Sequence, residues 1–541
     1  MSAATKASTV SDIGLPPKKS ASAAFGMLPS GAKAGQWALY GGLLAGIIIA
    51  LASFGGGAIR YRGGVLRALN LDFLAYGHGA AISNISLWVG TILLLISWVF
   101  LGRYVIIETR LGTACETILK QVQKSIWFWI LPLSLAAPIL SRDVYSYLMQ
   151  GAMTRDGFDP YIEGAAVNPG PMLLEVSHDW RNTTTPYGPL HLWLGEGITR
   201  LVGDNITAGV LLYKLVAITG FAGIAWAIPR LATYFTTNPA YALWLGVANP
   251  LMILHLIGGM HNESLMVGLV CIGLVLTLKN KYFAGVALIS VAVSLKATAA
   301  IALPFVVWIA LHKLIQKFGL TGWKQWVIWA AAGFITVAEM LGILAIITWA
   351  SGTSWGWLAE ITGNSKVINP LALPTLIAGL ISDTVLIINP QFEYNPLLEN
   401  LRLAGSFAML AGLILVWWFF RSTEKQAIQG IAIAYAVAFS LNSVTLPWYY
   451  ASLIPLIAVT PVPHAIKYWS TGISLFIALS FTGSGNHQLY NTAWMLGAAA
   501  LAWTLTHYIY FASAAKPAIS RTSSPAPDAE PPVLNAHAAH Q

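Results

Sequence analysis

An acidic residue beside two tyrosines follows one of the apolar runs of this chain. Asp143 comes shortly after the run that ends at Leu140, and Tyr145 and Tyr147 follow it closely. Carboxylates accept hydrogen bonds from hydroxyl groups, and aromatic rings cover the apolar faces of sugars. The segment is therefore typical of a carbohydrate-binding site. The alternative is that Asp143 caps a helix and that the tyrosines belong to an interfacial aromatic belt.

The same polar stretch contains two further groups of acidic, aromatic and basic side chains. The first lies in the sequence GFDPY, and the second in SHDWRN and the PYGP turn that follows it. These side chains suit contacts with sugar hydroxyl groups, but ordinary turn chemistry explains them equally well. The candidates for sugar or acceptor binding from this stretch are Tyr145, Asp159, Tyr161, Asp179, Trp180 and Tyr187.

Polar residues also lie between two later apolar segments. His261 and Glu263 fall in a short break that predicts a tight hairpin at a helix end, where Glu263 is a candidate to orient His261. Lys296 lies inside an apolar stretch one helix later, where a lysine is costly unless it is paired, hydrated or reaching for the surface. A lipid phosphate is a natural partner for its compact charge. The alternative is that the Lys296 side chain extends to the membrane surface and binds no ligand.

An aromatic cluster in the sequence LPWYY follows another apolar run. Trp448 and Tyr449 offer a platform on which a sugar ring can stack. An interfacial aromatic belt explains the cluster as well, so both interpretations stay open at this point.

The elements that must position these residues are membrane helices. Of the 541 residues, 56% are hydrophobic and only 9% are charged, whereas soluble proteins have about 25% charged residues. So little charge cannot cover a surface that faces water, so lipid must cover most of this protein. Counting apolar runs long enough to cross a bilayer predicts an all-α polytopic membrane protein with about 13 to 15 transmembrane helices.

Basic residues predict the topology. The net charge of +9 fits the excess of Lys and Arg that holds loops on the cytoplasmic side, and no nucleic-acid-binding motif accompanies it, so we expect no nucleic-acid partner. Placing most basic clusters inside makes residues 141–205 one long external loop, with a surface helix near 187–203. The scheme requires the proline-punctuated segment 370–390 not to cross the membrane, although the segment by itself fits either a span or a re-entrant element.

Three arginines do not fit this topology. Arg60, Arg62 and Arg67 fall on the external side, where the positive-inside rule predicts few basic residues. We keep this topology because the other basic clusters agree with it.

The chain divides into three expected parts. Residues 1–35 and 513–541 are rich in small and polar residues and predict disordered tails. Residues 36–512 form the transmembrane domain, whose external loop 141–205 carries the candidate catalytic residues. The two cysteines lie in separate apolar segments and predict neither a disulfide nor a zinc site.

Motif content narrows the function. The sequence contains neither a Walker A motif nor HExxH, so an ATP motor and a zincin protease are not indicated. No soluble nucleotide-sugar domain is visible either. Nucleotide sugars are not available to an enzyme outside the cytoplasmic membrane, whereas a lipid-linked sugar phosphate would supply one.

The ordered motifs of the chain resemble those of the C-fold (GT-C) glycosyltransferases that use polyprenyl-phosphate sugars. More narrowly, they are similar to the polyprenol-phosphomannose-dependent α-1,6-mannosyltransferases of actinobacterial lipomannan and lipoarabinomannan synthesis, and look closer to the early-acting, MptB-like type. No single motif is specific, and the ordered set carries the resemblance. The motifs are SRDVYSYLMQG, GFDPY, TTPYGPL, GGMHNES, SLKATAA and LPWYY.

The resemblance implies a reaction and its partners. Mannose would move from polyprenyl-phosphomannose to an α-1,6-mannan chain on a mannan or phosphatidylinositol-mannoside-type glycolipid. The change from a β-linked donor to an α-linked product is an inversion, which a single displacement achieves. The catalytic base of the family lies in the first long external loop, and the matching position is Asp143. The protein would be a multi-pass plasma-membrane protein with an external active site, surrounded by membrane lipids.

Charge on the leaving phosphate needs stabilisation, for which Lys296 is the first candidate and His261 and Arg181 are possible assistants. No cofactor and no metal are expected. A transporter or flippase of a lipid-linked sugar is the alternative function. It accounts for the spans and for Lys296, but less well for a long external loop rich in Asp, Tyr, Trp and Pro.

Overall fold

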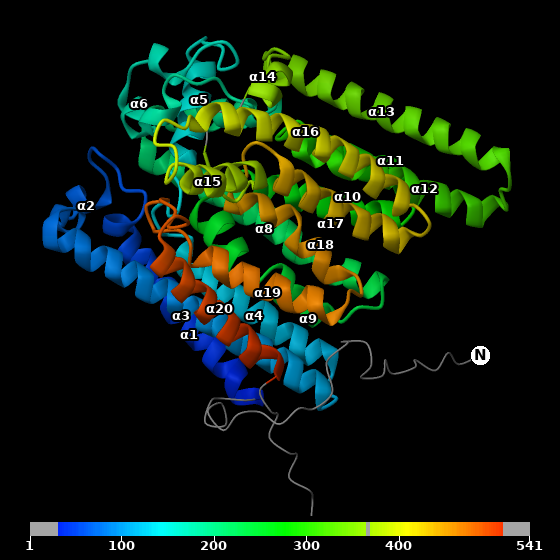
Figure 1. The fold of residues 1–541 in the computed structure, drawn as a ribbon, viewed down its shortest axis with the longest axis horizontal. Helices are drawn as coiled ribbons and strands as arrows, with labels where there is room; N and C mark the ends of the chain where they lie inside the picture. The colour runs from blue at the N-terminus through cyan, green and yellow to red at the C-terminus, as the bar shows by residue number, and fades with distance from the viewer. Residues whose placement is uncertain (1–30, 364–367, 512–541) are drawn as a thin grey trace, which may run out of the picture.

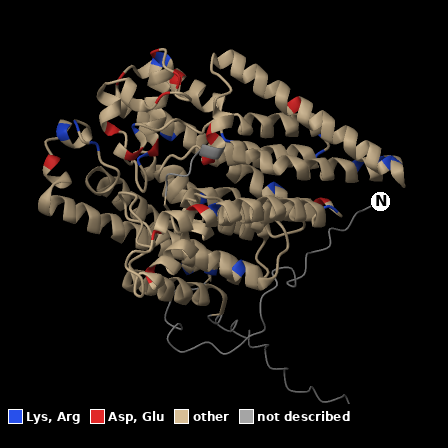
Figure 2. Ribbon diagram, turned by 45° about the horizontal axis from the view of Figure 1, so that its top comes forward, with Lys and Arg blue, Asp and Glu red and all other residues tan. Residues whose placement is uncertain are grey.

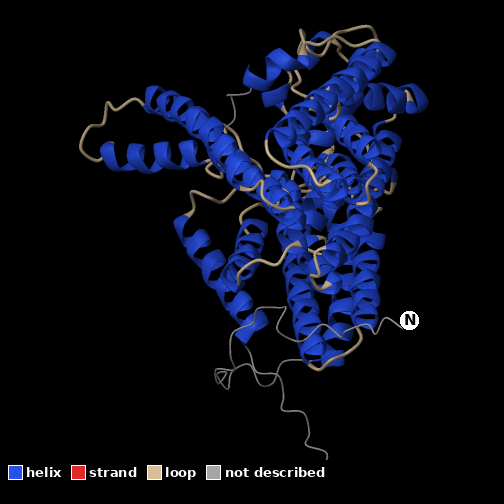
Figure 3. Cartoon of the chain, turned by 90° about the vertical axis from the view of Figure 1, so that its right-hand side faces the viewer, coloured by secondary structure: helices blue, strands red, loops and turns tan. Residues whose placement is uncertain are grey.

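The structure is a computed structural model that describes residues 31–363 and 368–511, and this part of the chain is built from helices and loops (Figures 1 and 3). Within these ranges no β-strand forms, and there is one isolated bridge between Phe481 and His487. The expected all-α class is confirmed. The first helix begins at Gly31, inside the segment 1–35 that we expected to be a tail. The rest of that segment, and all of 513–541, lie outside the described residues.

The helices follow one another along the whole described chain. The α-helices are α1 (Gly31–Gly56), α2 (Val65–Ala68), α3 (Gly77–Arg110), α4 (Cys115–Leu133), α5 (Asp143–Arg155), α6 (Pro171–Glu175), α7 (Pro189–Val202), α8 (Ile206–Tyr234), α9 (Pro239–Gly246), α10 (Glu263–Leu278), α11 (Tyr282–Val293), α12 (Leu303–Phe318), α13 (Trp323–Ser351), α14 (Trp357–Gly363), α15 (Leu373–Val385), α16 (Tyr394–Phe419), α17 (Glu424–Leu441), α18 (Ile454–Val459), α19 (His464–Ala478) and α20 (Thr492–Phe511). The short 3-10 and π-helical segments are η3 (Asp72–Ala75), η4 (Ala165–Val167), η5 (His178–Trp180), η6 (Met252–Gly258), η7 (Ala297–Ala302) and η8 (Pro447–Ser452).

Several of these helices are long and apolar enough to cross a membrane, which makes the chain a multi-pass membrane protein. Among the described residues there are six: α1, α3, α8, η7 with α12, α13 and α16; the bent pair of η6 and α10 would add a seventh. This count is lower than the about 13 to 15 expected from apolar runs, because backbone breaks divide several runs into helices shorter than about 20 residues. Within segment 370–390, α15 has only 13 residues, too few for a full span.

Charged residues are sparse along the long helices and gather mostly at helix ends and in loops, as Figure 2 shows. A charge in the hydrocarbon region is costly unless it is paired or hydrated. The distribution therefore agrees with helices that lie in a bilayer.

Local sequence fixes several helix ends. The side chain of Asn205 accepts a hydrogen bond from the Ala208 N–H at the start of α8, and Thr423 does the same for the Gln426 N–H at the start of α17. Such caps satisfy backbone donors that have no partner inside the helix. Gly319 ends α12 with a φ of 61°, the left-handed conformation that glycine adopts most easily.

The long polar stretch after α4 carries helices α5, α6 and α7, and α7 confirms the helix expected near 187–203. Helices α5 and α7 meet at two glycines. A Cβ added to Gly151 would lie 2.2 Å from the carbonyl carbon of Gly195, so this close approach requires glycine. The contact fixes the orientation of α5, the helix that begins with Asp143.

Two buried tryptophans connect α3 to α9. The rings of Trp98 and Trp244 stack with centroids 5.1 Å apart. Each indole N–H donates to the backbone carbonyl of the other residue, at 3.1 and 3.0 Å. Both buried donors are therefore satisfied, as buried indoles require. After a short turn at residues 247–249 the chain enters η6, which leads to the polar break around His261.

Helix α1 packs on α4 through small residues. A Cβ on Gly42 would lie 2.0 Å from Nε1 of Trp129, and one on Gly46 would lie 2.7 Å from the Trp129 carbonyl oxygen. The same indole N–H donates to the Ala38 carbonyl at 3.0 Å. Glycine and alanine are common between membrane helices because they let two backbones approach closely.

We expect Gly42→Val to lower the melting temperature of the purified protein, because overpacking a tight contact costs about 1–3 kcal/mol. The matched control is Gly342→Val in α13, where no atom lies within 4 Å of an added Cβ. Thermal unfolding followed by tryptophan fluorescence measures both. Equal melting temperatures for the two variants would contradict the close packing of α1 on α4.

Candidate functional site

A sharp turn places Asp143 at the first position of α5. Leu140 has a φ of 65°, and the Ser141 hydroxyl accepts a hydrogen bond from the Asp143 N–H at 3.1 Å. The carboxylate thus lies at a helix N-terminus, where the backbone dipole favours negative charge. The Asp143 side chain is 19% exposed, so a ligand can reach it.

His261 meets Asp143 from a break between two helices. The axes of η6 and α10 are bent by 117°, and His261 lies in this bend. Its Nδ1 is 3.5 Å from Oδ2 of Asp143, and its ring stacks on the indole of Trp448 with centroids 3.6 Å apart. The His261 side chain is fully buried. Stacking and burial therefore fix the ring with one nitrogen towards the carboxylate.

Glu263 and Lys296 form a buried ion pair next to these residues. The Lys296 ammonium also lies 4.2 Å from the ring centroid of Tyr449 and 5.5 Å from that of Tyr187. Lys296 thus has the partner that its apolar position demanded, and Glu263 contacts Lys296 instead of His261, the residue that we expected it to orient.

A further polar group lies on the same face of α5 and was not expected from the sequence. Nε2 of His191 is 3.1 Å from Oε1 of Gln150, and its Nδ1 is 3.4 Å from Nδ2 of Asn262. Tyr147 packs edge-on to His191 with centroids 4.8 Å apart. Positions 143, 147 and 150 share one helical face, so helical spacing from Asp143 signals Gln150. No comparable signal in the sequence marks His191.

Electrostatics keep Asp143 ionised. Burial acts to raise the pKa of Asp143, but the neighbouring His261 imidazole, the Ser141 hydroxyl and the charge of Lys296 outweigh it and hold the pKa below its usual value. Burial lowers the pKa of His191 to about 3, so that imidazole is neutral at physiological pH. Asp143 is therefore a carboxylate able to accept a proton.

A cavity of about 270 Å³ opens beside Asp143. Its walls come from α5, from the loop before α7, and from two segments near residues 444–449 and 481–487. Aromatic faces next to a carboxylate and hydroxyl groups suit a hydroxylated ligand. Within the described ranges, no three His, Cys, Asp or Glu side chains gather as metal ligands. The expected site residues that line the cavity are Asp143, Trp180, Tyr187, Trp448 and Tyr449.

Two expected site residues instead hold the loop together. The Arg181 guanidinium donates to the backbone carbonyls of Leu174 and Val176 at 3.2 Å. Tyr145 points to the other side of α5, where its hydroxyl donates to the Ala58 carbonyl at 2.8 Å. Neither residue lines the cavity beside Asp143.

Three more expected contacts also lie outside this cavity. Asp159 accepts a hydrogen bond from the Tyr161 N–H at 2.9 Å and one from the Ser354 hydroxyl at 3.3 Å, so it shapes a turn. Tyr161 is buried, whereas Asp179 is 63% exposed and lies 2.9 Å from the neighbouring imidazole of His178.

A multi-pass helical body with a carboxylate and aromatic rings around a cavity is the arrangement expected of a membrane enzyme that acts on sugars, and comparison with known proteins agrees. Residues 39–312 match the family described as Alpha-(1->6)-mannopyranosyltransferase, N-terminal domain, and residues 374–511 match the MptB C-terminal domain. The chain therefore belongs to the α-(1→6)-mannopyranosyltransferase family and is a glycosyltransferase.

Individual relatives support this membership. The chain is 57% identical over 488 residues to Alpha-(1->6)-mannopyranosyltransferase A of Corynebacterium glutamicum, covering 89% of this chain and 99% of the relative. It is 36% identical over 477 residues to the protein of the same name from Mycobacterium tuberculosis, covering 87% and 89%. Identity to Alpha-(1->6)-mannopyranosyltransferase B of Corynebacterium glutamicum is 28% over 461 residues, covering 80% and 74%. The C-terminal domain thus supports the expected likeness to MptB, while overall identity is higher to the A-type relatives.

We expect His261→Gln to shift the acid limb of the pH profile for mannosyl transfer towards higher pH. Glutamine removes the imidazole that contributes most to lowering the pKa of Asp143, so the carboxylate becomes protonated at a higher pH than in the wild type. The measurement is kcat/KM as a function of pH, which reports groups of the free enzyme. His178→Gln, whose side chain is 85% exposed, is the control. Identical acid limbs for wild type and His261→Gln would contradict this account of the Asp143 charge.

Proposed function

We propose that this protein transfers mannose from polyprenyl-phosphomannose to an α-1,6-mannan chain of lipomannan or lipoarabinomannan, at the external side of the plasma membrane. The observation that carries the proposal is the carboxylate of Asp143 at a cavity with aromatic walls. Family membership supports mannosyl transfer, and the membrane body suits a donor and a glycolipid acceptor that both carry lipid.

Asp143 is the proposed general base. The 6-hydroxyl oxygen of the acceptor forms a bond to the anomeric carbon of mannose, while the bond from that carbon to the phosphate oxygen breaks. The proton of the hydroxyl group passes to Asp143, and the bonding electrons leave with polyprenyl phosphate. One displacement of this kind, through an oxocarbenium-like transition state, inverts the anomeric configuration. The contact with His261 supports this role, because it lowers the pKa of the carboxylate and so favours the ionised form.

Lys296 is the proposed contact for the leaving phosphate, with His261 assisting. A phosphate leaves without a general acid but gains negative charge, which a nearby cation stabilises. Lys296 lies among Tyr187, Tyr449 and Glu263, next to the cavity. Glu263 holds the ammonium in place until the donor arrives.

Aromatic rings are the proposed sugar contacts. Trp180, Tyr187, Trp448 and Tyr449 line the cavity, and the stack of Trp448 on His261 keeps one wall rigid. We do not assign Arg181, Tyr145, Asp159 and Asp179 to the sugar site, because their observed partners lie outside the cavity.

Replacing Asp143 by Asn tests the base. We expect the kcat for mannose transfer from polyprenyl-phosphomannose to a short α-1,6-mannoside to fall about 10²- to 10⁴-fold, the usual contribution of general base catalysis. The control is Asp204→Asn, an exposed carboxylate paired with Arg155 on the surface. Radiolabelled donor and purified, folded protein give the rate. Near-wild-type turnover by Asp143→Asn would remove the base assignment, and no transfer by the wild type would remove the function.

Lys296 requires a paired design, because breaking a buried ion pair destabilises a protein by leaving the other charge alone. We compare Lys296→Met with the double variant Lys296→Met and Glu263→Gln, which removes both charges. The double variant should regain thermal stability. Its KM for the lipid donor should nevertheless stay about tenfold or more above the wild-type value, since a hydrogen bond to a charged group contributes about 1.5–3 kcal/mol. A double variant with wild-type KM would assign Lys296 a purely structural role.

A further inference from the structure

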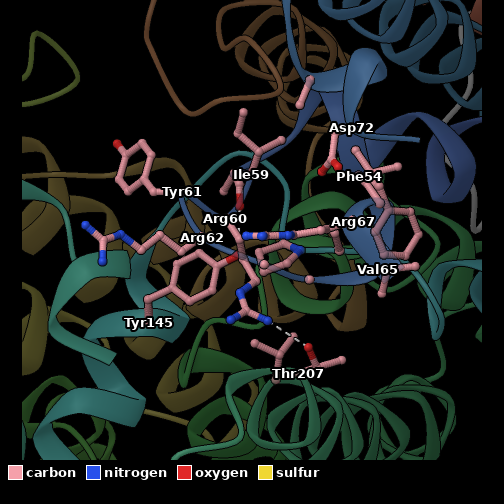
Figure 4. A pocket seen from close by; sticks show the side chains of 18 of the residues that line it. Phe54, Ile59, Arg60, Tyr61, Arg62, Val65, Arg67, Asp72, Tyr145 and Thr207 are labelled. Carbon is pink, nitrogen blue, oxygen red and sulfur yellow. Dashed lines mark hydrogen bonds between the residues drawn. The ribbon is translucent and has the colours of Figure 1, made fainter. Parts of the chain in front are cut away.

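A second cavity lies on the other side of the segment that carries Asp143. It measures about 650 Å³ and is formed by the ends of α1, α4 and α8 and by the segment between α1 and α3. Arg60, Arg62 and Arg67 all line it (Figure 4). These are the three arginines that do not fit the positive-inside pattern, so the cavity gives them a common location.

The carboxylates of this region do not neutralise its arginines. Glu175 is almost fully buried and lies 3.7 Å from Arg60 and 3.4 Å from Arg142. It also accepts hydrogen bonds from the backbone N–H groups of Tyr61 and Arg62. One carboxylate thus faces two guanidinium groups and two further donors.

Two arginine side chains remain without a carboxylate partner. Among the described residues, the guanidinium groups of Arg62 and Arg67 form no ion pair, and both residues are exposed. Asp72 is the carboxylate that lines the cavity with them. The cavity therefore carries a net positive charge and has free donors for an anion. Arginine matches phosphate well, because its planar group donates two parallel hydrogen bonds.

Many of the other residues that line the cavity are apolar. Phe54 on α1 and Val210 on α8 line it, together with Leu135 and Leu211. Leu135, which follows α4, is 70% exposed, and Leu211, on the candidate span α8, is 48% exposed. A ligand that carries an anion on a hydrocarbon chain would satisfy both kinds of wall.

The segment 136–145 separates the two cavities. Ala136 and Pro138 line the arginine cavity, whereas Asp143 lines the cavity described above. Arg142 joins the two sides, because it donates to the Ile59 carbonyl at 2.7 Å and its guanidinium lies 4.2 Å from the ring centroid of Tyr61. The segment that carries Arg60, Arg62 and Arg67 is therefore on the same side of the protein as Asp143.

We propose that this cavity binds a lipid by its phosphate group, with Arg62 and Arg67 as the phosphate contacts and the apolar wall against the hydrocarbon chain. The shared chemistry is a phosphate ester on a long chain, whether a membrane phospholipid or a polyprenyl monophosphate. The site is separate from the cavity at Asp143, and the proposal does not depend on the transfer reaction.

Native mass spectrometry of the detergent-purified full chain tests the site. Phosphatidylinositol, polyprenyl monophosphate and phosphatidylcholine are added one at a time, and inorganic phosphate serves as a competitor without a chain. The variant is Arg62→Gln with Arg67→Gln; both side chains are exposed, so the fold should persist, which circular dichroism checks. The matched control is Arg200→Gln, a 64% exposed arginine on α7.

We expect the double variant to retain the anionic lipids at least tenfold less than the wild type and the control do. Whichever of phosphatidylinositol and polyprenyl monophosphate binds better identifies the source of the phosphate. Equal retention by the folded double variant would overturn the proposal. Displacement of the lipid by inorganic phosphate at a comparable concentration would also overturn it, because a chain would then contribute nothing.

Discussion

The negative charge of Asp143 lies at the edge of an apolar helical body, where an unpaired charge is unstable. Three features stabilise it together: the N-terminus of α5, the imidazole of His261 and the charge of Lys296. Lys296 is itself paired with Glu263. Asp143, His261, Lys296 and Glu263 thus form one electrostatic unit, and of these four Asp143 lines the cavity. The chemistry proposed for the protein depends on this balance.

The packing of the protein serves to hold that unit in place. The Gly151–Gly195 contact sets the direction of α5, and the paired indoles of Trp98 and Trp244 fix α9, which leads into η6. The bend between η6 and α10 then presents His261 and Glu263 at one point. Close helix contacts of this kind are stiff, since packed interiors deform little. Rigid helices therefore position groups that come from distant parts of the sequence.

Basic side chains lie on both sides of segment 136–145, in different surroundings. On one side Lys296 is neutralised by Glu263 and sheltered by aromatic rings. On the other side there are more arginines than carboxylates, and these arginines share a cavity with apolar side chains. The first arrangement suits a reaction in which charge develops, and the second suits a resident anion on a lipid. The arginines that depart from the topological rule thus have a physical role in the proposed lipid site.

The sequence by itself determined the all-α membrane class, because low charge and long apolar runs are local properties that need no partner. It also marked Asp143, His261, Lys296 and Trp448, since polar and aromatic residues at helix ends stand out from their apolar surroundings. Only the tertiary structure decided which of the marked residues meet. Arg181 and Asp159 have the right chemistry, yet nearby backbone groups already occupy them, whereas His191 joins the site through Gln150 without any signal in the sequence. The structure also decided the number of full-length spans, because backbone breaks such as the one at His261 divide apolar runs into shorter helices. The physical reason is that a hydrogen bond or an ion pair depends on distance in space, and residues far apart in the chain acquire that distance only when the helices pack.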